Sequence, residues 1–577
     1  MRAIGRGAAL LGGVTLALGL AGAAWAQEAQ EAAAGKAPAG TYLAARAAVE
    51  ARDFATAADL LAEALARDEG DPWLLENGIA AELSLGQLED AAALAGQAVE
   101  VGLQSPLAHL TLQVARAAEG DWRGLLQEME AAHGVGPLVD GLSRGWAWQG
   151  LGNEEAALSA FDELAAAPGF RAFGLYHKAL ALALQGDLEG ADRLLSLPAS
   201  EGVQRTRRAV LAHAEVLSGL GRNRDAVALL DESFGGDLDA TLLALRDRLE
   251  AGETLPFTFV TSAGEGLAEA YLNVASALGE AEAATALLYA RAALALDPER
   301  SEAALLAASL LETLGQPGLA REAYALVPQE DPSFLAAELG RAGVLRAEGE
   351  DGAALEVLAG LARSFPDRPE VRATEGDLLR SLDRFVEAEA AYDKAIELSP
   401  SEAGSLWYLH FTRALSREAQ GDWPGTEEDL RRALELRPDQ PQVLNHLGYS
   451  LVERGEKLDE ALEMLERAVA LRPDSGAIVD SLGWALFKLG RHEEAVNHLE
   501  KAATLLPTDP VINDHLGDAY WTVGREREAR FQWSRALSLE PAPGEAERIR
   551  RKLIEGLEAF VPGEPETAAL EEDAPGG

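Results

Sequence analysis

The sequence predicts an all-α protein, an α-solenoid superhelix of about fourteen helix-turn-helix repeats with a capping helix at its C-terminal end. Prolines recur at intervals of 34, 34, 34, 38, 35, 34 and 34 residues, and turn-forming residues recur about seventeen residues before them. Ala, Leu and Glu are abundant, and runs of alternating Val, Ile and Thr that would favour strands are missing. These observations favour a repeated pair of helices.

The proline ladder comprises Pro298, Pro332, Pro366, Pro400, Pro438, Pro473, Pro507 and Pro541. The turn ladder comprises Gly315, Gly349, Asp383, Gly421, Gly455, Gly490 and Gly524. Five or six residues later comes a small side chain, at Ala320, Ala354, Ala388, Thr426, Ala461, Ala495 and Ala529. Glycine gives the turn its freedom, and proline cannot donate the N–H that would continue the second helix. Each period is therefore expected to be one helix-turn-helix unit.

The first half of the chain keeps the period with more variation in the surrounding residues. Its expected turns are Gly86, Gly120, Gly152, Gly186 and Gly221. We predict a degenerate N-terminal array over residues 41–250, an irregular junction over 251–266 and a C-terminal array over 267–543. At the junction, the apolar residues around Phe257 and Phe259 lose helical spacing. A hinge, a docking loop and a decayed repeat with a long loop all remain open.

The period and these residue types resemble the tetratricopeptide repeat, a helix-turn-helix family. The copies at 476–509 and 510–543 carry the resemblance most clearly, with Leu482-Gly483 and Leu516-Gly517 in their first helices. The resemblance covers nearly all of residues 41–543 and extends to exported bacterial repeat proteins of the cell envelope. It implies a protein-binding fold in which the first helices line a concave groove. It does not imply one particular function.

The two ends of the chain carry different signals. Arg2 and Arg6 precede an apolar run and Ala24-Trp25-Ala26, which predicts a signal peptide over 1–26, followed by a flexible segment over 27–40. The alternative is an uncleaved anchor helix. No later run is long enough to span a bilayer, so we expect a periplasmic or secreted protein without membrane insertion after cleavage.

The C-terminal end is expected to close the array. Residues 544–560 predict a capping helix, and the Pro-, Gly- and Glu-rich residues 561–577 predict a disordered acidic tail. The expected packing face of the helix comprises Ala546, Ile549, Leu553, Ile554 and Leu557. The expected polar face comprises Arg548, Arg550, Arg551 and Lys552.

Composition narrows the function classes. The chain has no cysteine, which excludes disulfides, thiolate zinc sites and cysteine nucleophiles. Its net charge of −45 should repel phosphate backbones, so nucleic acid is excluded as a partner. The same charge permits a basic partner.

No residue pattern predicts catalysis, a cofactor or a metal site, so we expect no enzyme. Gly141-Leu142-Ser143-Arg144-Gly145 matches a hydrolase nucleophile elbow, but no strand precedes Ser143 as that motif requires. His492 and His498 are six residues apart, on opposite faces of a helix, and so do not match a zinc-protease pair.

Outward positions of the last three first helices are the predicted partner-binding groove. They hold Asn445, His446, Tyr449, Asp480, Trp484, Phe487, Asp514, Asp518 and Trp521. Tryptophan contributes strongly at interfaces, and Asn445 has both a donor and an acceptor for a peptide backbone. The alternative for Trp484 is ordinary core packing between adjacent first helices. The family's clamp for a C-terminal carboxylate uses Lys, Arg and Asn, so these acids and aromatics favour a basic or apolar segment.

The leading hypothesis is a non-catalytic protein–protein interaction scaffold or adaptor of the bacterial cell envelope that binds peptide segments or helices. The alternative is a recognition subunit of an envelope polysaccharide or secretion enzyme complex. A third hypothesis is a hydrolase that depends on Ser143.

Overall fold

The computed structural model describes residues 39–131, 134–198, 200–235, 240–401 and 403–557. The predicted signal peptide, nearly all of the segment 27–40 and the acidic tail lie outside these ranges. All regular structure in the described residues is helical, which confirms the predicted fold class. None of the described helices is both long and apolar enough to cross a membrane. The described residues form two compact units, divided between Val357 and Leu358.

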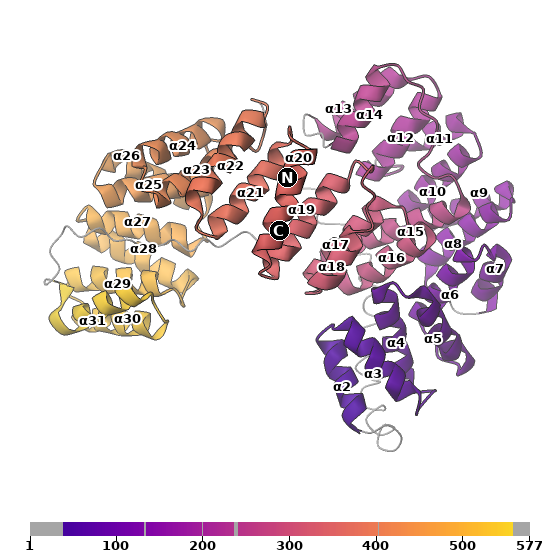
Figure 1. Cartoon of the computed structure of the whole chain (residues 1–577), viewed down its shortest axis with the longest axis horizontal. Coiled ribbons are helices and arrows are strands. Elements are labelled where there is room, and N and C mark those ends of the chain that lie inside the picture. The colour runs from indigo at the N-terminus through magenta and orange to yellow at the C-terminus, as the bar shows by residue number, and fades with distance from the viewer. Residues whose placement is uncertain (1–38, 132–133, 199, 236–239, 402, 558–577) are drawn as a thin grey trace. The chain divides into compact units, whose positions relative to one another are not determined.

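The helices of the first unit run from indigo to rose in Figure 1. They are α2 (Ala39–Glu50), α3 (Phe54–Leu65), α4 (Pro72–Leu85), α5 (Leu88–Glu100), α6 (Pro106–Ala118), α7 (Trp122–Ala131), α8 (Pro137–Gly150), α9 (Glu154–Ala166), α10 (Arg171–Leu184), α11 (Leu188–Leu195), α12 (Arg207–Gly219), α13 (Asn223–Phe234), α14 (Ala240–Glu250), α15 (Ala263–Leu278), the 3-10 turn η1 (Gly279–Glu282), α16 (Ala283–Leu296), α17 (Ser301–Thr313), α18 (Pro317–Tyr324) and α19 (Phe334–Ala347). Helix α20 (Asp351–Ser364) contains the division between the units.

The helices of the second unit are α21 (Pro369–Ser381), α22 (Phe385–Leu398), α23 (Leu406–Ala419), α24 (Trp423–Leu436), α25 (Pro441–Arg454), α26 (Leu458–Leu471), α27 (Gly476–Lys488), α28 (His492–Leu505), α29 (Pro510–Thr522), α30 (Glu526–Ser538) and α31 (Pro543–Glu555). Among the described residues, fourteen consecutive pairs can be counted from α2 to α30 when α14 is left out. This number agrees with the predicted repeat count.

The sequence signals act at the helix ends as expected. Pro510 begins α29, and the Asp509 carboxylate accepts hydrogen bonds from the backbone N–H groups of Val511 (2.8 Å) and Ile512 (3.0 Å). Gly490 ends the first helix of its repeat with φ +76°. Asp383, which replaces glycine in the turn ladder, adopts the same left-handed region with φ +57°. Aspartate tolerates this region better than most residues, so the ladder continues through it.

The small residues of the pattern lie between paired helices. Ala320, Ala388 and Ala495 have no exposed surface. A Cβ atom added to Gly483 would lie 2.7 Å from a side-chain carbon of Leu499 on α28, so the close approach of α27 to α28 depends on the glycine. Side chains of this size at the contact let neighbouring helices exclude water over their whole length.

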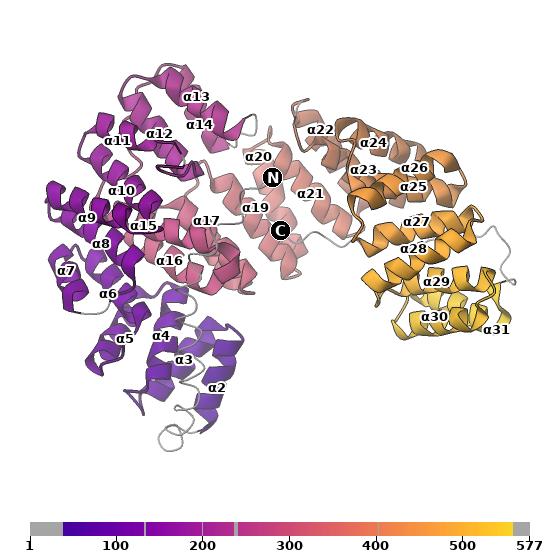
Figure 2. The same ribbon diagram turned by 180° about the vertical axis from the view of Figure 1, so that it is seen from behind.

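In the first unit, the chain returns on itself after α14. Helix α15 packs against α8 and α10, and α16 packs against α4 and α6, as both Figure 1 and Figure 2 show. The contacted helices are the first members of their pairs. The 34-residue period does not predict this packing, because it describes only contacts between consecutive helices.

Residues 251–262 form the non-helical connection between α14 and α15. The Glu215 carboxylate on α12 accepts backbone hydrogen bonds from Thr258 (2.7 Å) and Phe259 (2.9 Å). The backbone N–H of Leu255 donates to Ser218 Oγ at 2.9 Å. The predicted loss of helical spacing therefore corresponds to an extended segment bonded along α12. The division between the compact units falls elsewhere, after Val357.

Candidate partner-binding surface

The predicted groove residues lie on three adjacent first helices of the second unit. Helix α25 carries Asn445, His446 and Tyr449; α27 carries Asp480, Trp484 and Phe487; and α29 carries Asp514, Asp518 and Trp521. Helix α27 packs directly against both α25 and α29. The structure therefore brings the nine residues onto neighbouring helices, although it gives them different degrees of exposure.

Trp484 lies inside this layer. Its ring stacks on His515 with centroids 3.9 Å apart, and its Nε1 donates to Glu453 Oε1 at 2.7 Å. Only 4% of Trp484 is exposed. These contacts join α27 to α29 and α25, which corresponds to the core-packing alternative for Trp484.

Asp480 and His446 are also buried and paired within the layer. Asp480 contacts His515 Nδ1 at 3.0 Å, and His446 Nε2 lies 2.6 Å from Glu418 Oε2 on α23. Burial alone would raise the pKa of the Glu418 carboxyl, but its contact with His446 and a hydrogen bond from Ser450 lower it. The outward exposure expected of Asp480 and His446 is therefore wrong.

Asp514 and Asp518 face α31 instead of solvent. Lys552 Nζ lies 2.8 Å from Asp514 Oδ2 and 2.7 Å from Asp518 Oδ2, and Arg548 donates to Asp514 at 2.9 Å. Trp533 Nε1 donates to the second Asp518 oxygen at 2.9 Å. Burial raises the pKa of Asp518 to about 6, because the attraction of Lys552 offsets only part of the desolvation and the charge of Asp514 adds to it.

The prediction for α31 is wrong at two positions. Lys552, expected on the polar face, is 3% exposed, whereas Ile554, expected on the packing face, is 80% exposed. Ala546 and Ile549 are buried as expected. A signal for Lys552 does exist in the sequence, because Arg548 and Lys552 come 34 residues after Asp514 and Asp518. Helix α31 thus takes the position that the first helix of another repeat would have.

Four predicted residues keep part of their surface: Asn445, Tyr449, Phe487 and Trp521. Asn445 Oδ1 is itself buried and has no hydrogen-bond partner among the described residues. The ring of Phe487 stacks on that of Trp484 with centroids 4.9 Å apart, and the ring centroids of Trp521 and Trp533 are 5.3 Å apart. These half-exposed side chains stand on a buried, internally bonded layer.

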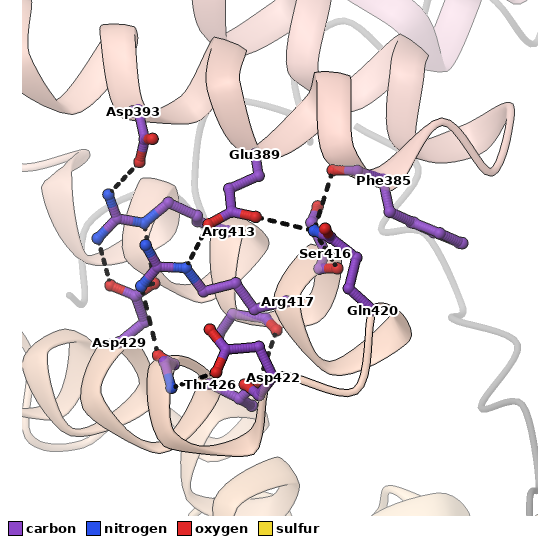
Figure 3. Close-up of polar contacts among 12 residues, drawn as sticks. Phe385, Glu389, Asp393, Arg413, Ser416, Arg417, Gln420, Asp422, Thr426 and Asp429 are labelled. Carbon is purple, nitrogen blue, oxygen red and sulfur yellow. Dashed lines mark hydrogen bonds and ion pairs between the residues drawn. The ribbon is translucent and has the colours of Figure 1, made fainter.

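An ion-pair network supports the preceding repeats, and no sequence pattern pointed to it. Arg413 and Arg417 of α23 reach Asp429 of α24 at 2.6 Å and 2.9 Å, as Figure 3 shows. The same two arginines pair with Asp393 (2.6 Å) and Glu389 (2.8 Å) of α22. Burial opposes ionisation of Asp429, but hydrogen bonds from His410 and Arg413 outweigh it and lower the pKa. The network fixes α23 between its two neighbours.

Ser143 does not have the surroundings of a catalytic serine. It lies inside α8, is fully buried, and its Oγ is 3.5 Å from the Tyr271 hydroxyl of α15. A nucleophile elbow instead exposes its serine on a turn between a strand and a helix.

Stacked helix pairs with a period near 34 residues define a helical repeat protein, a class that generally binds other proteins. Tetratricopeptide-repeat family models match residues 369–402, 411–475 and 452–510. These segments are tetratricopeptide repeats, as the sequence pattern predicts.

Curated relatives match part of the chain. Human Tetratricopeptide repeat protein 13 is 31% identical over 153 residues, and TPR repeat-containing protein PA4667 of Pseudomonas aeruginosa is 29% identical over 133 residues. The matches cover 24% and 23% of this chain and only 16% and 22% of those relatives.

Solved structures of the same class are more distant in sequence. The APC/C hetero-tetramer Cut9-Hcn1 is 16% identical, with a TM-score of 0.39 over 89% of this chain and 96% of that chain. YrrB, described as a TPR protein with an unusual peptide-binding site, is 20% identical, with a TM-score of 0.28 over 34% of this chain and 99% of that chain.

Proposed function

We propose that this chain is a non-catalytic scaffold or adaptor of the bacterial cell envelope. In this proposal, a segment of another protein binds across the first helices α25, α27 and α29. The supporting observation is the placement of half-exposed Asn445, Tyr449, Phe487 and Trp521 on these adjacent helices. The layer beneath them is held by internal hydrogen bonds, so binding requires little ordering of the receptor.

The proposed partner segment is basic or apolar, and a helix suits it best. Helix α31 provides the chemical precedent, because it places Ile549 in the core while Arg548 and Lys552 pair with the acids of α29. A net charge of −45 adds a long-range attraction for a basic partner. Burial of the partner's apolar side chains would supply most of the binding free energy.

The test is capture from a cell-envelope extract by the full chain and by an Asn445→Ala, Tyr449→Ala double variant. We expect the double variant to retain less than about one tenth of the captured partner, because truncating a tyrosine at an interface hot spot costs about 2 kcal/mol or more. Phe531→Ala is the matched control, since Phe531 is a 64% exposed aromatic on a second helix, α30. Equal capture by wild type and double variant would contradict the proposed surface.

The envelope setting has a separate test. Signal cleavage after Ala26 predicts a mature chain that begins at Gln27. N-terminal sequencing of the protein recovered from a periplasmic fraction would measure this directly. Recovery of the chain with residues 1–26 attached, in the cytoplasmic fraction only, would contradict the setting but leave the binding surface untouched.

A further inference from the structure

Helices α15 and α16 lie across the first helices of the N-terminal array. In Figure 2 they run beside α4, α6, α8 and α10, in agreement with the packing of α15 on α8 and α10 and of α16 on α4 and α6. The first-helix side is the side on which arrays of this class receive a partner. Here that side is covered by a later part of the same chain.

Helix α15 lies deep in the first unit. Its residues 266–272 are buried without exception. A Cβ atom added to Gly266 would lie 2.3 Å from the ring of Trp146 on α8. The backbone of α15 therefore rests directly on that ring. Buried residues from α6, α8, α10, α15 and α16 belong to one continuous hydrophobic core.

A single buried carboxylate fixes the position of α15 in this core. Glu269 accepts a hydrogen bond from the Tyr176 hydroxyl of α10 at 2.8 Å and from Arg300 at 3.1 Å. It also accepts three hydrogen bonds from Arg208 of α12, two of them from Nε at 2.9 Å and one from Nη2. Burial would raise the pKa of Glu269, but the charges of Arg208 and Arg300 lower it. The Glu269 carboxylate therefore stays ionised beside the two arginines.

Arg291 fixes α16 in a similar way. Its Nε donates to the backbone oxygen of Ser84 at 3.0 Å, at the C-terminal end of α4. Both residues are buried, and a cation is favoured where the carbonyl groups of a helix end. The contact joins residues 207 positions apart in the sequence. Glu269 and Arg291 thus specify one register of the two helices on the array.

We propose that residues 263–296 are the resident ligand of the N-terminal array, held in register by Glu269 and Arg291, and that partner proteins are left with the C-terminal array. The assignment of the resident ligand needs no external partner. The restriction of partners to the C-terminal array rests on the proposed function.

The resident ligand can be tested by cutting the connection to it. A specific protease site inserted between Ala251 and Gly252, which are exposed, allows the folded full chain to be cut before α15. We expect the two pieces to migrate together at the mass of one chain in native buffer. Separation of the pieces would overturn the proposal, and so would a complex with the mass of two chains, which would place α15 and α16 on a second copy.

The register is tested in the same cut chain with Glu269→Arg. We expect the dissociation constant between the pieces to rise on the order of 100-fold or more, because an uncompensated charge cluster would remain buried. Glu302→Arg is the matched control, since Glu302 pairs with the same Arg208 at 2.8 Å but its side chain is 48% exposed. Equal weakening by both variants would overturn the role of Glu269. Should Glu269→Arg prevent folding of the uncut chain, Glu269→Gln replaces it, with a weakening of at least about tenfold expected.

Discussion

Lys552 lies 34 residues after Asp518, and its ammonium is 2.7 Å from the Asp518 carboxylate. This ion pair links α31 to α29, and its 34-residue separation equals the spacing between first helices of successive repeats. Helix α31 therefore covers the last hydrophobic edge of the array with buried charges as well as apolar contacts. The acids of α29 are thus already occupied, while the partly exposed side chains of α25 and α27 are not covered by α31.

Lys552→Ala should destabilise the C-terminal end of the second unit by about 3–5 kcal/mol, since it leaves Asp518 buried without its cationic partner and Asp514 with Arg548 alone. Urea unfolding followed by tryptophan fluorescence reports on this region, because Trp533 hydrogen-bonds to Asp518. Arg550→Ala is the control, as Arg550 is exposed on the same helix. A loss below about 1 kcal/mol for Lys552→Ala would contradict the structural role of the pair.

Asp518 should contribute a distinctive pH dependence. Its pKa in the folded chain is raised to about 6, above its usual value of 3.8, so the folded state binds more protons between these values. Its contribution to the free energy of unfolding is therefore largest below about pH 4 and is lost as the pH rises through about 6. The free energies of unfolding of wild type and Asp518→Asn, measured at pH 4 and at pH 7, isolate the contribution of Asp518. The same difference between the two proteins at both pH values would refute this pH dependence.

Trp484→Ala should cost about 3–5 kcal/mol of stability, the usual loss for truncating a buried aromatic. Tyr449→Ala should cost far less, because Tyr449 is only partly buried. Chemical denaturation of the two variants measures the contrast. A small loss at Trp484 would show that its ring belongs to an accessible surface.

Gly490→Ala should destabilise its repeat by about 1–2 kcal/mol, since φ is +76° there and a Cβ atom is strained in that region. Gly544→Ala is the matched control. Gly544 lies in the first turn of α31, and an added Cβ would meet no atom within 4 Å. We expect that variant to be neutral or slightly stabilised. Thermal unfolding of both proteins tests the comparison, and an equal effect would contradict the turn assignment.

The repeat pattern predicted the fold well because its signals are local. Proline, turn glycine and small residues act on the helix that contains them or on its immediate neighbour, so their spacing is sufficient to predict helix pairs. The aspartate at position 383 fits the same rule, because its turn keeps the left-handed conformation. By contrast, Glu269 and Arg291 act on residues far away in the chain, and no local spacing predicts their contacts.

The candidate surface was predicted less completely. Helical periodicity places Trp484 and Asp514 on the outward side of their own helices. Their burial depends on residues that come later in the chain: His515 stacks on Trp484, and Lys552 pairs with Asp514. Whether a side chain on a first helix is exposed therefore depends on the residues of the neighbouring repeats as well as on its own helix. The partial exposure of Asn445 and Tyr449 on α25 likewise depends on how the neighbouring first helices α23 and α27 pack against it.

Hydrogen exchange of the full chain, with and without its captured partner, tests the central proposal most directly. We expect added protection in α25, α27 and α29, and no change in α4, α6, α8 and α10, which already carry α15 and α16. Protection confined to α4–α10, with none in α25–α29, would contradict both the proposed binding surface and the resident ligand.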